Sequence, residues 1–206
     1  MSSVSFNRDL LLEAFDAIGK AALDAGTRLE ISVYGGSALM LASNFRFSTE
    51  DVDIAAIEKP WPAWLQQAAH DLARRNGWHD DWLNEGIAMY LSPQASPSHD
   101  HLPFGSFPRQ ADRPGLIVQI PSARYLLALK LRALRMGDPN KARTDLDDVQ
   151  ALLRTLEITS ADAALAVMLS FFPQSATDTA KQRFVINHLL KQPQDDHAPR
   201  YPQTGL

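Results

Sequence analysis

The chain of 206 residues contains no cysteine. This absence excludes disulfide bonds, thiolate zinc centres and cysteine nucleophiles. A chain without disulfides suits a reducing compartment, and we expect a cytoplasmic location. A chain of this length buries on the order of 70% of its unfolded surface, so a hydrophobic core can stabilise it without covalent cross-links.

The sequence also lacks a secretory leader and long apolar runs. The first residues, MSSVSFNRDLLLEAF, have no basic segment followed by an apolar core, so no secretory signal is expected. No apolar run approaches the roughly 20 residues that a membrane-spanning helix needs, and no membrane partner is expected. The formal net charge of -4 gives no indication of non-specific nucleic-acid binding.

What is present is the composition of an ordinary globular protein, with 45% hydrophobic and 21% charged residues. Short apolar or alternating runs predict strands over residues 29–33, 51–57, 87–91 and 116–120. The stretch 92–101 is rich in serine, proline and aspartate, which is typical of an exposed loop. Apolar residues at helical spacing predict a helix that starts after Ser122 and others over residues 7–25, 37–42, 61–77, 144–156, 160–172 and 176–190.

The order of these elements predicts an α+β (mixed α/β) fold, because strands and helices come first and helices alone follow. We expect a small mixed sheet flanked by helices in residues 1–121. A helical C-terminal part, residues 122–191, is expected to pack on it. The polar, proline-rich residues 192–206 are expected to form a flexible tail.

The stretch from Gly35 to Ser37 follows a predicted strand and precedes a predicted helix. Glycine permits positive φ and a close approach of a ligand to the backbone. A helix N-terminus presents free N–H groups and the positive end of the helix dipole, which together suit a phosphate. The hydroxyl of Ser37 adds a donor. The alternative is a tight turn followed by an ordinary helix cap.

Asp51 and Asp53 lie two residues apart in the second predicted strand. Side chains at this spacing share a face of a strand, with Cα atoms about 6.6 Å apart. Two carboxylates there repel each other unless a cation lies between them. Oxygen ligands favour Mg²⁺ or Mn²⁺, which leave coordination positions for substrate phosphates. The alternative is a solvated strand end.

Four blocks of the sequence, taken in order, resemble the AbiEii-type nucleotidyltransferases of the DNA polymerase β-like superfamily, which include toxins of toxin–antitoxin and abortive-infection systems. Together they cover about residues 33–153. The blocks are Gly35-Gly36-Ser37-Ala38-Leu39, Arg46-Phe47-Ser48-Thr49-Glu50-Asp51-Val52-Asp53, Leu129-Lys130-Leu131-Arg132-Ala133-Leu134-Arg135 and Arg143-Thr144-Asp145-Leu146-Asp147-Asp148-Val149.

The resemblance implies an enzyme with a nucleotidyltransferase-type core that moves a nucleoside monophosphate from an NTP to a hydroxyl. The acceptor would be an RNA 3′ end such as that of tRNA, or a protein side chain. Mg²⁺ or Mn²⁺ would be the cofactor and an antitoxin protein a partner. Asp51 and Asp53 would bind the metal, and Gly35, Gly36 and Ser37 the β- or γ-phosphate.

Further residues receive roles from the same resemblance. Lys130 would steady the triphosphate as a point charge, and Arg46 and Thr49 would contact phosphate. Asp145 or Asp148, which share a helix face, would activate the acceptor hydroxyl or bind metal. The alternatives are a lysine that reaches out of an apolar helix, an arginine that braces its loop, and acidic residues that favour the helix dipole.

One position departs from the superfamily pattern, in which many active members carry a third carboxylate on a later strand. The predicted strand LIVQIP offers Gln119 there. A neutral side chain weakens binding of a second metal. The sequence therefore leaves open an enzyme with one metal, a catalytically weak nucleotide-binding protein that retains the fold, and an interaction protein whose C-terminal helices bind a partner.

Two other groups of residues have a functional and a structural interpretation. His99 and His101 have the spacing of a metal-ligand pair, but they lie in the predicted loop without a partner cluster, so an exposed loop is favoured. Trp78, Trp82, Leu83 and Asn84 could line a base pocket, since aromatic rings stack on nucleobases, and core packing or a hydrophobic lid is favoured for them.

Overall fold

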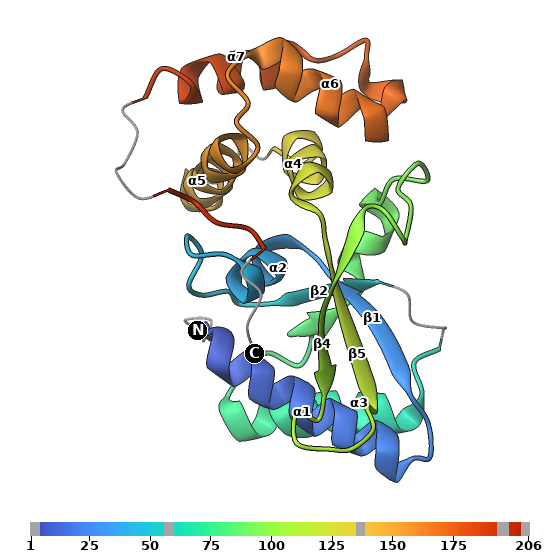
Figure 1. Ribbon diagram of the computed structural model, residues 1–206. Helices are drawn as coiled ribbons and strands as arrows, with labels where there is room; N and C mark the ends of the chain where they lie inside the picture. The colour runs from blue at the N-terminus through green and yellow to red at the C-terminus, as the bar shows by residue number, and fades with distance from the viewer. Residues whose placement is uncertain (1–4, 56–59, 135–138, 193–197, 203–206) are drawn as a thin grey trace.

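A computed structural model describes residues 5–55, 60–134, 139–192 and 198–202, except the side chains of residues 139–142. The fold is mixed α+β, with a five-stranded sheet that contains parallel and antiparallel pairs. In Figure 1, α1 and α3 lie at one end of the molecule and α4 to α7 at the other, with the sheet and α2 between them. The fold class predicted from the sequence is confirmed.

The strands follow the order β3-β2-β1-β5-β4 across the sheet. Strand β1 is central, parallel to β5 and antiparallel to β2. The edge strand β3 is parallel to β2, and the other edge strand β4 is antiparallel to β5. The strands are β1 (Leu29–Val33), β2 (Val52–Ala55), β3 (Leu83–Asn84), β4 (His101–Phe107) and β5 (Leu116–Pro121).

The sheet has one apolar face and one largely polar face. Directly paired residues share a face, so the pairs Val33–Ile54 and Leu29–Leu116 belong to the apolar face. Helices α1 (Arg8–Asp24) and α3 (Ala63–Asn76) cover this face, where the ring of Phe15 packs at 5.3 Å against that of Phe107. The alternate positions, among them Glu30, Gln119 and Asp53, belong to the other face.

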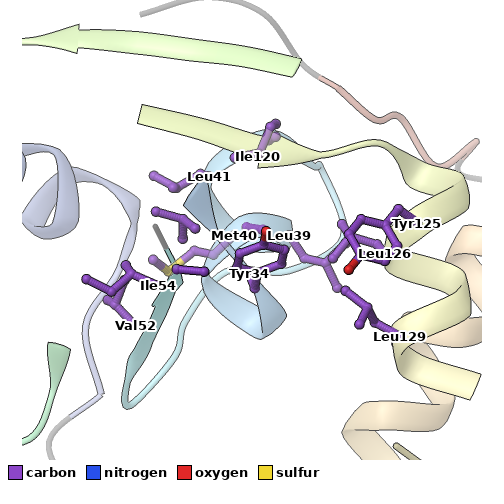
Figure 2. Packing of buried hydrophobic residues seen from close by; sticks show 14 of the residues in the cluster. Tyr34, Leu39, Met40, Leu41, Val52, Ile54, Ile120, Tyr125, Leu126 and Leu129 are labelled. Atoms are coloured by element: carbon purple, nitrogen blue, oxygen red, sulfur yellow. The ribbon is translucent and has the colours of Figure 1, made fainter. Parts of the chain in front are cut away.

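Helix α2 (Gly35–Ala42) connects the sheet to the C-terminal helices. It is apolar on nearly all sides and buried from Ser37 onward. Figure 2 shows Met40 near Val52 and Ile54 of β2, while Leu126 and Leu129 extend from α4 (Ala123–Arg132) toward the other side of α2. Because α2 is buried between β2 and α4, its first turn has a fixed position relative to both.

Four helices and a short 3-10 turn follow the sheet. Helix α4 begins at a Ser122 cap whose hydroxyl accepts a hydrogen bond from the Tyr125 N–H. Helices α5 (Pro139–Thr155) and α6 (Ala161–Phe171) pack against α4, and α7 (Ala180–Leu189) packs against α6. The predicted boundary at residue 121 coincides with the end of β5, but one continuous core cluster spans both sides of it.

Residues Ala198–Tyr201 are attached to the body of the protein. Asn44 donates to the Ala198 carbonyl and accepts from the Arg200 N–H. The Tyr201 hydroxyl donates to the Pro121 carbonyl at 2.6 Å. The polar, proline-rich composition of residues 192–206 did not predict these contacts, and residues 193–197 and 203–206 of that predicted tail lie outside the described part of the chain.

Most predicted helices and strands are confirmed, and one predicted strand is not. The strand predicted over residues 87–91 is wrong, since Gly86–Tyr90 form a 3-10 helix, η1, in which no residue is buried. Strand β4 was not predicted, and its first residue, His101, ended the expected loop; it carries Pro103 and Gly105. It is an edge strand with an irregularity between these two residues, and proline is tolerated there. Residues 56–57, the predicted end of the second strand, lie outside the described ranges.

Candidate functional site

The turn between β1 and α2 lies directly against Asp53. The Tyr34 N–H donates to the Asp53 carbonyl at 2.8 Å, which continues the pairing of β1 with β2. Gly35 follows with a φ of +63°, a conformation that favours glycine. A Cβ at Gly35 would lie 2.9 Å from Asp53 Oδ2. The predicted carboxylate and the predicted glycine turn are therefore in contact.

The N-terminus of α2 has no side-chain cap. Its N-cap is Tyr34, whose side chain accepts no hydrogen bond from the helix. The first N–H groups of an α-helix have no partner within the helix, and together with the helix dipole they favour an anion. Asp53 lies at the same turn, so a divalent cation bound by this carboxylate could bridge it to a phosphate on the helix.

Two hydroxyls fix the backbone of Asp51. The buried hydroxyls of Ser37 and Thr49 both donate to the Asp51 carbonyl, at 2.5 and 3.1 Å. Each hydroxyl has a single proton, so neither donates to a phosphate in this arrangement. The predicted phosphate contacts of Ser37 and Thr49 are thus not part of the described geometry, which instead makes them positioning residues for Asp51. The side chain of Asp51 is exposed.

A cluster of four charged side chains lies between α4, α5 and the loop after α2. Lys130 Nζ contacts Asp145 Oδ1 and Asp148 Oδ2, both at 2.7 Å. Arg46 contacts Asp148 Oδ2 at 3.2 Å. The side chains are 12% (Lys130), 11% (Asp145), 3% (Asp148) and 20% (Arg46) exposed. Two cations and two anions therefore compensate one another in a mostly buried position.

Arg46 joins this cluster to the turn. Its Nε donates to the Ser48 carbonyl at 2.9 Å, which braces the loop, and one terminal nitrogen would lie 2.9 Å from a Cβ at Gly36. The guanidinium thus lies over the first turn of α2. Three of the four sequence blocks meet here in space, with Asp53 against Gly35 and Arg46 against Gly36.

The fourth block contributes through Asp145 and Asp148, which the structure places against Lys130. Arg135, at the end of the third block, lies outside the described residues. Close contacts therefore link Gly35 with Asp53, Gly36 with Arg46, and Arg46 and Lys130 with the two aspartates of α5, and none of these contacts involves the side chain of Asp51.

Gln119 lies on the polar face of the sheet, opposite Ser32. It donates to Glu30 Oε1 at 2.6 Å. Glu30 lies four residues, or about 13 Å, before Tyr34, which follows directly on β1, so this carboxylate does not stand in for a third acid beside Asp53.

The residues present fit one hard divalent cation. Asp53 supplies a carboxylate at a helix N-terminus, and a magnesium site commonly uses one or two carboxylates and fills the rest of its shell with water and phosphate. Among the described residues there is no group of three or more histidine, aspartate or glutamate side chains that could hold a metal by themselves. Substrate oxygens would have to complete the shell.

Two further residues lie beside Asp53, and the sequence assigned neither of them to the metal or phosphate site. Asn84 pairs with Asp53 across β2 and β3, and its Oδ1 accepts from the Gly86 N–H at 2.8 Å. A Cβ at Gly86 would lie 3.9 Å from Asp53 Oδ1. The asparagine thus holds the start of η1 next to the carboxylate. The weak pattern of residues 78–115 gave no signal for this contact.

A second unpredicted group lies behind the turn. The Tyr34 hydroxyl and His101 Nε2 are 2.8 Å apart, and both rings pack edge-on against Tyr125. Burial raises the pKa of Tyr34, with a further contribution from Tyr125, and burial lowers the pKa of His101. His101 is the first residue of β4 and a partner of Tyr34. His99, by contrast, is exposed and contacts Ser96 and Ser98.

Trp78 and Trp82 pack in the core, as favoured from the sequence. Their rings are 4.8 Å apart and both contact Phe6, and the indole N–H of Trp82 donates to the Ala69 carbonyl.

No helix in the described ranges is long and apolar enough to cross a membrane. No protein-family model matches the chain, and no curated protein matches it significantly.

Proposed function

We propose that the protein is a metal-dependent nucleotidyltransferase that moves a nucleoside monophosphate from an NTP to a hydroxyl acceptor. The observation that carries this proposal is that Asp53 lies against Gly35 and Arg46 against Gly36, the first two residues of a helix without a side-chain cap. Carboxylates for a metal and cations for a phosphate then flank one anion-binding turn.

The reaction is a displacement at the α-phosphorus. The acceptor hydroxyl oxygen forms a bond to this phosphorus, the bond to the bridging oxygen breaks, and pyrophosphate leaves with the electron pair. The hydroxyl proton passes to a base or to water. The protein contributes position and charge, since little covalent chemistry is required of it.

Different residues would bind different parts of the nucleotide. Asp51 and Asp53 would hold Mg²⁺ or Mn²⁺, which when bound neutralises charge on the phosphates. The first N–H groups of α2 would receive the β- or γ-phosphate. Lys130 and Arg46 would stabilise the negative charge that develops on the leaving pyrophosphate.

Removing both acids tests the proposal. Asp51→Ala/Asp53→Ala is expected to lower transfer of label from [α-³²P]NTPs to total RNA or protein by more than about 100-fold, because even residues that only orient metal ligands typically contribute 10- to 100-fold. The matched control is Asp80→Ala/Asp81→Ala, which removes two exposed carboxylates elsewhere. Melting temperatures establish that both variants fold. Transfer that survives in the first variant would exclude this mechanism.

A second candidate is a nucleotide-binding protein with little or no catalysis. It is favoured by one observation, the neutral Gln119 bonded to Glu30 where a third acid is expected. NTP with Mg²⁺ that raises the melting temperature without transfer to any acceptor would favour it. The toxin role and the antitoxin partner belong to the first candidate, and growth arrest that depends on Asp51 and Asp53 on expression in a bacterial host would support them.

A further inference from the structure

The two aspartates that contact Lys130 differ in their surroundings. Asp148 is 3% exposed and contacts two cations, Lys130 and Arg46, through the same oxygen. Asp145 is 11% exposed and contacts Lys130 through Oδ1. The two residues are three apart in α5, so both face α4 from one side of the helix.

Asp148 sets the distance between the two cations. Lys130 Nζ and the Arg46 nitrogen lie 2.7 and 3.2 Å from one oxygen atom, so they are held within about 6 Å of each other. Like charges at that distance repel, and the carboxylate between them removes this repulsion. Without Asp148 we expect Arg46 to leave its place over Gly36.

Asp145 is the more exposed of the two carboxylates that contact Lys130, at 11% against 3%. A carboxylate oxygen and a phosphate oxygen are interchangeable as acceptors for an ammonium group. A triphosphate carries more charge than a carboxylate, so it competes well for the same donor. The exchange leaves Lys130 paired throughout, which avoids the large penalty of a buried, unpaired charge.

We propose that Asp148 is a positioning residue that keeps Lys130 and Arg46 together, and that Asp145 occupies the place on Lys130 that a nucleotide phosphate takes on binding. This inference rests on the proposed function. It assigns the two aspartates opposite effects on phosphate affinity, and it makes neither of them the base that activates the acceptor hydroxyl.

The probe is inorganic tripolyphosphate with Mg²⁺, because the inference concerns the phosphates of the nucleotide and not its base. Calorimetry measures the affinity of the full chain for this probe. Asp145→Asn is expected to tighten binding about 10-fold, since one charge-assisted hydrogen bond no longer competes. Asp148→Asn is expected to weaken binding about 10-fold or more. The control is Asp147→Asn, which removes the same charge from the exposed face of the same helix and is expected to change affinity less than about 2-fold.

The outcomes separate this inference from the proposed function. Asp145→Asn that binds tripolyphosphate no more tightly than the wild type, while the wild type binds it and transfers nucleotide, overturns the inference alone. Asp145→Asn that loses transfer at unchanged affinity makes Asp145 catalytic, which also overturns it. A wild type that neither binds the probe nor transfers nucleotide overturns both. If Asp148→Asn does not fold, the tripolyphosphate affinity of Asp145→Asn compared with that of Asp147→Asn tests the inference.

Discussion

At the scale of single residues, Gly35 explains why the turn and strand β2 depend on each other. Its positive φ alone asks for glycine, and Asp53 Oδ2 occupies the space where a side chain would begin. Gly26 also has a positive φ, of +68°, but nothing lies within 4 Å of its added Cβ. Comparing substitutions at the two glycines therefore distinguishes the cost of backbone strain from the effect of the contact with Asp53.

Gly35→Ala is expected to destabilise the protein more than Gly26→Ala. The strained backbone costs about 1–2 kcal/mol in both variants, and only Gly35→Ala also displaces the Asp53 carboxylate. Urea unfolding of both variants measures the difference, and nucleotide transfer is expected to fall in Gly35→Ala alone. Equal losses of stability with unchanged transfer in both would contradict the contact described for Asp53.

The sequence predicted the residues of the site better than their partners. Gly35, Asp53 and Lys130 could be found because each belongs to a short local pattern. That the hydroxyl of Ser37 serves Asp51, or that Arg46 contacts Asp148, could not be found, because Arg46 and Asp148 are 102 positions apart and their contact depends on how α5 crosses the loop after α2. Side-chain partners of this kind are set by packing.

At the scale of helices and strands, the close approach of α1 to the β4–β5 hairpin stands out. A Cβ at Gly19 would lie 2.5 Å from the Phe107 carbonyl oxygen and 2.6 Å from its carbon. A Cβ added at Gly115 would likewise overlap the Gly19 carbonyl oxygen. A glycine in the middle of α1 thus lets the helix rest on backbone atoms of the hairpin.

Gly19→Ala is expected to lower the free energy of unfolding by about 2 kcal/mol, the usual cost of overfilling a packed position. Helix propensity alone predicts the opposite, a gain of about 1 kcal/mol. The control is Lys20→Ala, which changes a neighbouring exposed side chain and is expected to shift stability by less than about 0.5 kcal/mol. Denaturant unfolding that finds Gly19→Ala more stable than the wild type would rule out the close packing.

Local sequence patterns predicted β1 at its observed bounds and β5 to within one residue, since both are buried apolar strands at the centre of the sheet. They failed for η1, whose run Ile87-Ala88-Met89-Tyr90 is β-like in composition but has no buried residue. They gave no strand for β4, which pairs with β5 although it contains a proline and a glycine. At the sheet edges, tertiary pairing decided the outcome.

At the scale of the whole molecule, buried tyrosines connect the sheet, the C-terminal helices and the C-terminal segment. Tyr34 joins β1 to β4, Tyr125 of α4 accepts from the Ser92 N–H, and Tyr201 attaches the last described residues to β5. Burial is the main cause that raises the pKa of all three phenols.

The free energy of unfolding is therefore expected to fall as the pH rises above about 10, the ordinary pKa of tyrosine. In that range the unfolded chain loses phenol protons that the folded protein retains, so stability decreases with pH, by up to about 1.4 kcal/mol per pH unit for each tyrosine. Tyr201→Phe removes one of these groups and should give a shallower decline. Urea unfolding between pH 8 and 11 measures both slopes, and parallel slopes would contradict the role of Tyr201.

The contact of Arg46 with Asp148 also has a consequence for synthesis. Translation delivers the glycine bend and its two acids roughly a hundred residues before the aspartate that orders the guanidinium beside them. A nascent or truncated chain that stops short of α5 would display the acids without organised cations. Activity of the proposed kind would then begin only once the C-terminal helices have folded back onto the older half of the chain.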